Sequence, residues 1–172
     1  CPSFVTVQGG TPRKKQATDF TLPDMPEPAL PQIKGTWNIV ITGIGGTGAV
    51  TVGANLAMAA HLDGLGAGMM EMAGLAQKGG AVNIHCRVAK RPEDINAIRI
   101  ATGEADAVVG CDLVTTAGSK TLGLMSSGRT GGVINSHSTV TGAFTRDTEF
   151  RVPADRLQLA LEAKLQGRAT LF

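Results

Sequence analysis

The segment Val40–Gly48, which reads V-I-T-G-I-G-G-T-G, constrains the fold of this chain more than any other. An apolar run of β-forming residues breaks there into closely spaced glycines. This pattern is typical of a tight connection between a buried strand and a helix that begins near an anion. We expect Gly43 to permit the turn, Gly45 to let a ligand or another chain approach the backbone, and Gly48 to allow close packing of helix on strand.

The backbone around this first glycine loop, Gly43–Gly48, also predicts an anion-facing surface. The N–H groups of Gly46, Thr47 and Gly48 would point outward, with the positive end of the helix dipole behind them. A glycine turn that joins strand to helix without binding a ligand explains the same residues and stays an alternative.

A second glycine-rich segment follows at Ala73–Val82, A-G-L-A-Q-K-G-G-A-V. Its centre, the second glycine loop Gln77–Gly80, combines an amide, a cation and two permissive glycines between two predicted strands. Such a loop, formed by Gln77, Lys78, Gly79 and Gly80, can face an anion. A surface turn with a solvated lysine is the simpler alternative.

Apolar runs separated by helical patterns predict an α/β fold. The expected strands cover 37–42, 67–72, 82–88, 107–110 and 131–135, with a less certain hairpin or edge strand at 141–145. Helices are expected over 47–62 and 111–125. A last helix follows Pro153, which suits a first helical turn, and carries the apolar stripe Ala154, Leu157, Leu161 and Leu165. This alternation predicts a mostly parallel, Rossmann-like sheet with helices on both faces.

Composition divides the chain into an arm and a domain. Residues 1–36 contain several prolines and the basic run Arg13-Lys14-Lys15, which predicts an extended, Pro-rich linker or an arm that wraps over a neighbouring domain. Residues 37–172 form the predicted domain. Because the chain opens at Cys1 and ends on the apolar pair Leu171-Phe172, we expect a fragment of a longer polypeptide.

Composition also argues against several partners. The 16 Lys and Arg nearly balance the 14 Asp and Glu, and aromatic residues are only 3% of the chain, which disfavours nucleic-acid binding. No apolar run approaches the ~18 residues of a membrane span. The three cysteines, Cys1, Cys86 and Cys111, lack C-x-x-C spacing, which disfavours a disulfide framework or a complete metal site and predicts a reducing, cytoplasmic location.

Few residues suggest chemistry on their own. Glu71 follows the first glycine loop by about 20 residues, the spacing at which a carboxylate holds the ribose of NAD. His85 alternates with Asn83 and Arg87 on one strand face, where a structural histidine with satisfied hydrogen bonds is the simpler interpretation. Cys86 and Cys111 are expected to be ordinary buried thiols.

Four motifs in order carry a family resemblance. They are G-I-G-G-T-G, G-L-A-Q-K-G-G-A-V, G-E-A-D-A-V-V-G-C-D at 103–112 and V-I-N-S-H at 133–137. Together they resemble the gamma domain of the 2-oxoacid:ferredoxin oxidoreductases, and most of all the fused indolepyruvate ferredoxin oxidoreductase type. The opening C-P-S-F-V-T-V is similar to the stretch that joins the thiamine domain to the gamma domain. Gly74-Leu75 favours the arylpyruvate branch over the pyruvate branch.

The resemblance implies an enzyme that oxidatively decarboxylates an arylpyruvate, forming acyl-CoA and CO2 and reducing ferredoxin. Thiamine diphosphate and iron–sulfur clusters would be held by other domains of the same enzyme. This chain alone is expected to hold none of these cofactors tightly. The gamma domain is associated in the family with access of coenzyme A. The two glycine loops are therefore assigned ligand-facing or interface roles. No residue of this chain is assigned a catalytic role.

Two further interpretations remain open from the sequence. The chain can be a freestanding nucleotide-binding regulatory module that uses Glu71, or a purely structural assembly domain. The Cys1-Pro2 pair is typical of the end of an iron–sulfur ligand run, so that Cys1 would ligate or adjoin a cluster of the preceding domain. An exposed linker thiol is the alternative for Cys1.

Overall fold

The computed structural model describes Asp24, residues 26–27, 29–30, 32–73, 79–139, Glu149 and residues 151–172. The chain falls into two compact units, Cys1–Pro31 and Gln32–Phe172, and all described helices and strands belong to the second. The hairpin expected at 141–145 lies outside the described residues, as does most of the predicted arm.

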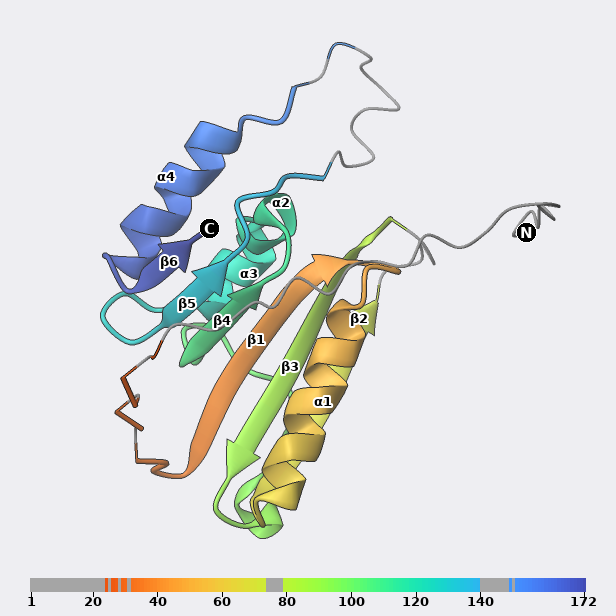
Figure 1. The fold of residues 1–172 in the computed structure, drawn as a ribbon, viewed down its shortest axis with the longest axis vertical. Coiled ribbons are helices and arrows are strands. Elements are labelled where there is room, and N and C mark those ends of the chain that lie inside the picture. Colours follow the sequence, from red (N-terminus) through yellow and green to blue (C-terminus); the bar gives the residue numbers. More distant parts are fainter. Residues whose placement is uncertain are drawn as a thin grey trace, which may run out of the picture. The chain divides into compact units, whose positions relative to one another are not determined.

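A six-stranded sheet forms the centre of the second unit (Figure 1). Its strands lie in the order β2-β3-β1-β4-β5-β6. Among them β1 pairs in parallel with β4, β4 with β5 and β5 with β6, whereas β3 runs antiparallel to both of its neighbours. The bounds are β1 Thr36–Ile44, β2 Gly66–Ala73, β3 Ala81–Ala89, β4 Ala107–Gly110, β5 Gly131–Ile134 and β6 Ala169–Leu171. The sheet is therefore mostly parallel, as predicted.

Helices cover both faces of this sheet, which confirms the predicted layers. On one face α1 (Ala49–Leu62) packs over β1, β2 and β3 (Figure 1). The opposite face is covered by α2 (Leu113–Thr116), α3 (Ser119–Leu124) and α4 (Ala154–Leu165). The short 3-10 helix η1 (Pro92–Asp94) lies against β2.

Alternation along β1 divides the core in two. Val40 is buried under α2 and α4 with Leu161 and Leu165, whereas Ile39 and Ile41 are buried on the α1 side. Successive side chains of a strand point to opposite faces, so an uninterrupted apolar strand requires cover on both. At Gly53, α1 lies so close to the sheet that an added Cβ would be 3.0 Å from the side chains of Ile84 and Met69.

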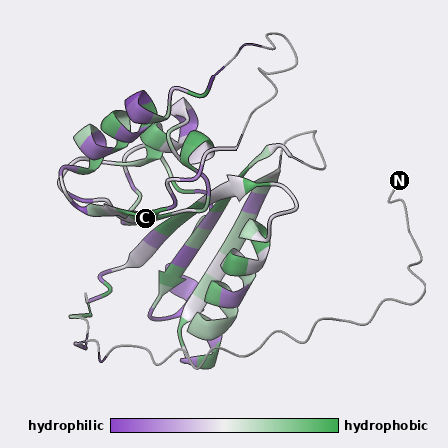
Figure 2. Ribbon diagram, turned by 45° about the horizontal axis from the view of Figure 1, so that its top comes forward, coloured by the Kyte–Doolittle hydropathy of each residue, from purple (hydrophilic) through white to green (hydrophobic). Residues whose placement is uncertain are grey.

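The two long helices differ in how hydrophobic they are (Figure 2). Hydrophobic and hydrophilic residues alternate along α4, and its apolar stripe ends in the buried Leu161 and Leu165. Apolar residues predominate all around α1, so that it exposes large side chains on its outer side. No helix within the described ranges combines the length and the apolar character needed to cross a bilayer.

One predicted element differs from the structure, and two features of the sheet were not predicted. The helix expected over 111–125 is two helices, because Gly118 has an extended backbone and becomes the N-cap of α3. The strand β6 was not predicted, since it has only three residues. β3 runs antiparallel to β2, because the connection across 74–80 is shorter than the dozen or so residues that a parallel crossover requires.

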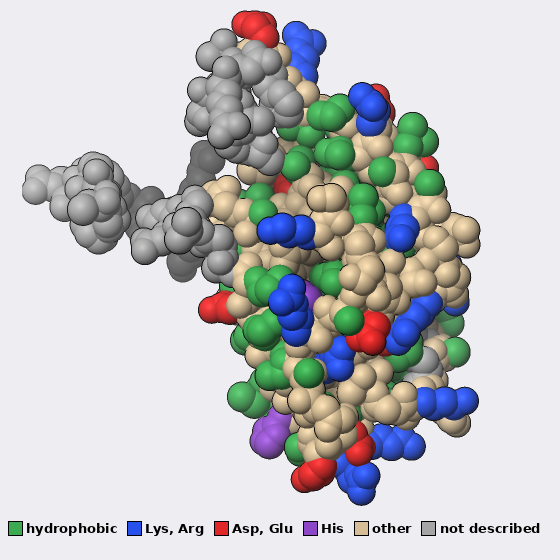
Figure 3. All heavy atoms as spheres, turned by 180° about the vertical axis from the view of Figure 1, so that it is seen from behind, with side chains coloured by type: hydrophobic (Ala, Val, Ile, Leu, Met, Phe, Trp, Pro, Cys, Tyr) green, Lys and Arg blue, Asp and Glu red, His purple; other side chains and the backbone are tan. Residues whose placement is uncertain are grey.

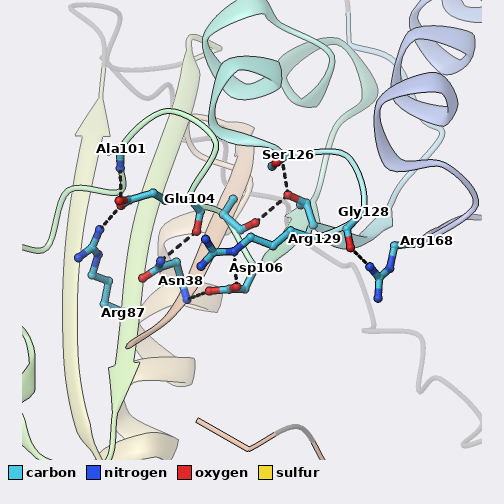
Figure 4. A network of polar contacts seen from close by, with 11 residues as sticks. Asn38, Arg87, Ala101, Glu104, Asp106, Ser126, Gly128, Arg129 and Arg168 are labelled. Atoms are coloured by element: carbon cyan, nitrogen blue, oxygen red, sulfur yellow. Dashed lines mark hydrogen bonds and ion pairs between the residues drawn. The ribbon is translucent and has the colours of Figure 1, made fainter. Parts of the chain in front are cut away.

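A polar network fixes the segment that leads into β4 (Figure 4). The carboxylate of Glu104 pairs with Arg87 at 2.9 Å and accepts a hydrogen bond from the N–H of Ala101. Asp106 accepts from the N–H of Asn38 at 2.9 Å and pairs with Arg129 at 2.7 Å. These contacts hold the loop before β4 against β1 and β3.

Candidate functional site at the glycine loops

The structure brings the two glycine loops together. The N–H of Gly45 donates to the carbonyl of Gly80 at 2.8 Å, and the N–H of Gly79 donates to the carbonyl of Gly45 at 3.2 Å. These bonds continue the β1–β3 pairing beyond Ile44 and Ala81. Gly45 therefore admits another segment of the same chain to its backbone, where a ligand or another chain was expected.

The other glycines of the first loop have different tasks from those expected. Gly43 allows the close packing, because an added Cβ would lie 2.8 Å from the Cβ of Ala49 and 3.3 Å from that of Cys111. Gly46 and Gly48 make the turn, with φ of +88° and +95°. No atom of the described residues lies within 4 Å of a Cβ added at either one. Within the described part of the chain, their outer side is therefore open.

The amino end of α1 lacks a side-chain cap. Its N-cap is Gly48, and the first turn carries no acidic residue. Of the N–H groups expected to face outward, that of Thr47 instead donates to the carbonyl of Ile44 at 3.2 Å, to which the Thr47 hydroxyl also donates at 2.7 Å. A small hollow of about 280 Å³ borders this helix end, lined by Ile44, Gly45, Gly46, Gly48, Ala49, Val50 and Thr51. Unpaired N–H groups and the helix dipole favour an anion there.

A larger cavity of about 480 Å³ lies at the carboxyl ends of β1, β4 and β5. After β1 the chain passes to β2 and β3 on one side, and then returns to β4 on the other. Ligands of open α/β sheets bind at such a point, where the strand order reverses. The lining residues include Thr47, Cys111, Asp112, Asn135 and His137.

Asp112 organises this cavity, a role that the sequence reasoning missed. It is buried and accepts hydrogen bonds from the N–H and hydroxyl of Thr115, at 2.8 and 3.0 Å, and from the N–H of Thr139 at 2.8 Å. The carboxylate thus caps α2 and ties the segment after β5 to the end of β4. Asp is a preferred N-cap residue, and its place between a predicted strand and a predicted helix could have revealed this role.

Burial shifts the pKa values of two cysteines and one histidine. Burial raises the pKa of the Cys86 thiol and also that of the Cys111 thiol. Cys86 is buried as expected, whereas Cys111 is half-buried and lines the cavity. Burial, together with the charges of Arg99 and Arg87, holds the pKa of His85 below its usual range.

Several predicted residues lie apart from this site. Glu71 is exposed on the edge strand β2, and β3 separates it from β1 and the first glycine loop. Cys1, Gln77 and Lys78 lie outside the described residues. Within the described part of the chain, no group of three or more His, Cys, Asp or Glu side chains is placed to hold a metal ion.

Comparison with known proteins identifies relatives of the chain. The family model described as pyruvate ferredoxin/flavodoxin oxidoreductase matches residues 38–170. Indolepyruvate oxidoreductase subunit IorB of Archaeoglobus fulgidus is 39% identical over 75 residues, which are 44% of this chain and 35% of that protein. The chain thus spans about a third of the length of this curated relative.

Two solved structures are also similar. The gamma subunit of a keto/oxoacid ferredoxin oxidoreductase from Geobacter sulfurreducens PCA aligns with a TM-score of 0.46 and 20% identity, over 60% of this chain and 52% of that one. The PORC subunit of pyruvate oxidoreductase from Thermotoga maritima aligns with a TM-score of 0.48 and 18% identity, over 80% and 61% of the two chains.

Proposed function

Because the chain belongs to the pyruvate ferredoxin/flavodoxin oxidoreductase family, we propose that it is the gamma domain of a 2-oxoacid ferredoxin oxidoreductase that acts on indolepyruvate or a related arylpyruvate. The observation that carries this proposal is the family match over 38–170, a range that begins in β1 and ends in β6. The 39% identity with an indolepyruvate oxidoreductase subunit supports the arylpyruvate branch.

In the proposed reaction the 2-oxoacid loses CO2, its acyl group passes to coenzyme A and the released electrons reduce ferredoxin. Thiamine diphosphate, when bound by another domain, supplies the carbanion chemistry, and iron–sulfur clusters carry the electrons. A cluster with only cysteine ligands takes four thiolates, and this chain has three cysteines, so it does not furnish such a cluster alone. A role for Cys1 beside a cluster of the preceding domain stays a prediction.

The first glycine loop is the part of this chain that we assign to coenzyme A or to the domain that holds it. The open outer side of Gly46 and Gly48 and the uncapped amino end of α1 support this assignment. Phosphate groups are suitable ligands for unpaired N–H groups at the start of a helix. Gly79 and Gly80, which directly precede β3, position this loop through their bonds to Gly45.

The outer side of α1 supports contact with another domain of the enzyme. Met58 and Leu62 expose 57% and 77% of their surface, and Val50 and Val52, nearer the start of α1, are also exposed. A helix that is apolar on all sides is normally buried on all sides. Cover from a neighbouring domain or subunit would bury this surface.

The nucleotide-binding alternative is disfavoured by the strand order. In a dinucleotide-binding sheet the second strand lies beside the first, so that its terminal carboxylate reaches the ribose. Here β3 lies between β1 and β2, which moves Glu71 outward by one strand, to about 10 Å from β1 in the plane of the sheet.

The test is an activity assay of the complete enzyme that contains this chain. Ferredoxin reduction is followed with indolepyruvate, phenylpyruvate or pyruvate, each with and without coenzyme A. We expect CoA-dependent reduction that is fastest with an arylpyruvate. Preference for pyruvate would contradict the substrate class, and no reduction with any of the three 2-oxoacids would contradict the proposed reaction.

A further inference from the structure

A second, larger cavity lies on the face of the sheet opposite α1, and it is lined in part by Gly80, whose carbonyl accepts a hydrogen bond from Gly45. Its volume is about 850 Å³, within the range of small-molecule sites. It lies over β2 and β3, between the loop 99–102 and α3. The lining residues are Met72, Gly80, Ala81, Asn83, His85, Arg99, Ile100, Ala101, Thr102, Lys120 and Leu124.

His85 contributes a buried donor that has no acceptor among the described residues. The side chain is 1% exposed, and its Nδ1 accepts a hydrogen bond from the N–H of Ile100 at 2.8 Å. A neutral imidazole whose Nδ1 accepts carries its proton on Nε2. This Nε2 is buried without a partner in the described part of the chain. The histidine expected to be satisfied is therefore only half satisfied, and an orphaned buried donor costs free energy unless a ligand accepts its hydrogen bond.

The other polar groups around the cavity are also donors. Asn83 uses its Oδ1 to accept from the Thr121 hydroxyl at 3.0 Å, which leaves its Nδ2 available. Arg99 and Lys120 are exposed, and neither has an ion-pair partner among the described residues. No Asp or Glu is among the described lining residues. Lys and Arg side chains lie among hydrophobic ones over this face of the molecule (Figure 3).

The loop that carries Arg99 and Ile100 is held in place, so that the cavity is preformed on that side. Glu104 binds both the N–H of Ala101 and the guanidinium of Arg87, as Figure 4 shows. Arg87 is paired with Glu104 and does not line the cavity, so the cationic side chains that line it are those of Arg99 and Lys120.

We propose that this cavity binds a small organic anion, with a carboxylate or phosphate group on an apolar body. The oxyanion would accept from His85 Nε2 and Asn83 Nδ2 and lie near the charges of Arg99 and Lys120. Met72, Ile100 and Leu124 would contact the apolar body. The site goes beyond the proposed reaction and does not depend on it.

The test is a binding titration of the isotope-labelled 172-residue chain, followed through its histidine and amide nitrogen resonances. The probes are phenyl phosphate and phenylacetate, which share an aromatic body, and benzyl alcohol as their neutral counterpart. We expect saturable shifts of the His85 resonances with at least one of the anions and none with the alcohol. The anion that binds with the lower dissociation constant then shows whether the cavity prefers a phosphate or a carboxylate group. The proposal would be overturned if neither anion produced saturable shifts, or if the alcohol shifted the His85 resonances as much as the anions do.

Variants that remove single positive charges test whether the anion binds in this cavity. Arg99→Gln and Lys120→Gln change exposed side chains and should each weaken binding about fivefold, the upper range for one partly exposed charge contact. Arg156→Gln removes the same charge from exposed α4, outside the cavity, and should leave the affinity unchanged. A well-dispersed spectrum verifies folding of each variant. Equal weakening by all three substitutions would show diffuse attraction in place of a site.

Discussion

At the scale of the residue, the first glycine loop depends on two separate properties of glycine. Gly43 lies in β1 and is needed for its small size, because α1 approaches it there. Gly46 and Gly48 are needed for their backbone conformation, since their positive φ values strain any side-chain-bearing residue. Substitutions in the same short loop should therefore fail for different reasons.

A double-mutant cycle separates the two reasons. Gly43→Ala should lower the free energy of unfolding by about 1–3 kcal/mol through overpacking against the Cβ of Ala49. In the background Ala49→Gly, which removes that Cβ, the cost of Gly43→Ala should shrink, whereas the cost of Gly46→Ala should not. Urea denaturation of the variants measures this coupling. Equal costs of Gly43→Ala in both backgrounds would show that the contact with Ala49 is not what limits the position.

His85 makes the stability of the chain depend on pH. Burial and the nearby charges of Arg99 and Arg87 lower its pKa in the folded state, so the unfolded state binds the proton more readily. The free energy of unfolding should therefore fall as pH drops below about 6.5 and stay level above it. Unfolding at pH 5.5 and 7.5 tests this, and His85→Gln should reduce the difference. The exposed His61→Gln is the matched control, and an equal reduction there would contradict the assignment.

At the scale of the element, α2 depends on one carboxylate. The helix has only four residues, too few to be stable by its own hydrogen bonds. Asp112 caps it and also holds the N–H of Thr139, so one side chain fixes the start of α2 and the segment that follows β5. This arrangement shapes the cavity at the carboxyl ends of the strands.

Replacing this cap should destabilise the chain measurably. Asp112→Ala leaves two N–H groups and a hydroxyl without their acceptor, and should cost about 1–3 kcal/mol of unfolding free energy. Asp155→Ala is the control, because Asp155 is exposed in the first turn of α4 and makes no cap hydrogen bond. Chemical denaturation compares the two variants. A cost at position 112 no larger than that at 155 would contradict the role of the cap.

Long elements could be predicted from the sequence, whereas short and tertiary features could not. β1, α1 and α4 have apolar patterns long enough to indicate their type and their buried side. The break at Gly118 and the strand β6 depend on local packing over a few residues. The glycine spacing predicted the first loop, but not that Gly79 and Gly80 would pair with Gly45, because that contact depends on β3 lying beside β1.

The cavity around His85 shows the same limit. His85, Asn83 and Arg87 were predicted to share one strand face, and they do, opposite Val40, Thr42 and Asn38. Arg99 and Lys120 reach this face from a loop and from α3, which no periodicity connects to β3. Only the folded structure places their charges beside the unpaired Nε2 of His85.

At the scale of the whole molecule, the strand order separates this fold from a dinucleotide-binding domain. The glycine loop and the parallel strands β1, β4 and β5 resemble one, but β3 replaces the neighbour that would carry the ribose-binding carboxylate. At the point where the strand order reverses, this chain has an uncapped helix end and a cavity organised by Asp112.

The chain should therefore not bind NAD or NADP tightly. Isothermal calorimetry with NAD, NADP and coenzyme A on the 172-residue chain measures this. We expect no heat of binding for the nicotinamide cofactors at micromolar concentrations. A micromolar dissociation constant for either one would show that Glu71 or another group replaces the missing ribose contact.

The most direct test of the account is the effect of Gly46→Val on the complete enzyme. A Cβ added there lies within 4 Å of no described atom, and a side chain at this positive φ costs roughly 1–2 kcal/mol of backbone strain. Gly64→Val is the matched control, because Gly64 has a φ of +75°, equally open surroundings and a place just beyond the other end of α1. The measurement is the KM for coenzyme A in 2-oxoacid-dependent ferredoxin reduction, with subunit assembly determined on the same preparations. We predict a raised KM or lost assembly for Gly46→Val and near-normal values for Gly64→Val. Equal, near-normal values for both variants would show that neither coenzyme A nor a neighbouring domain approaches the first glycine loop.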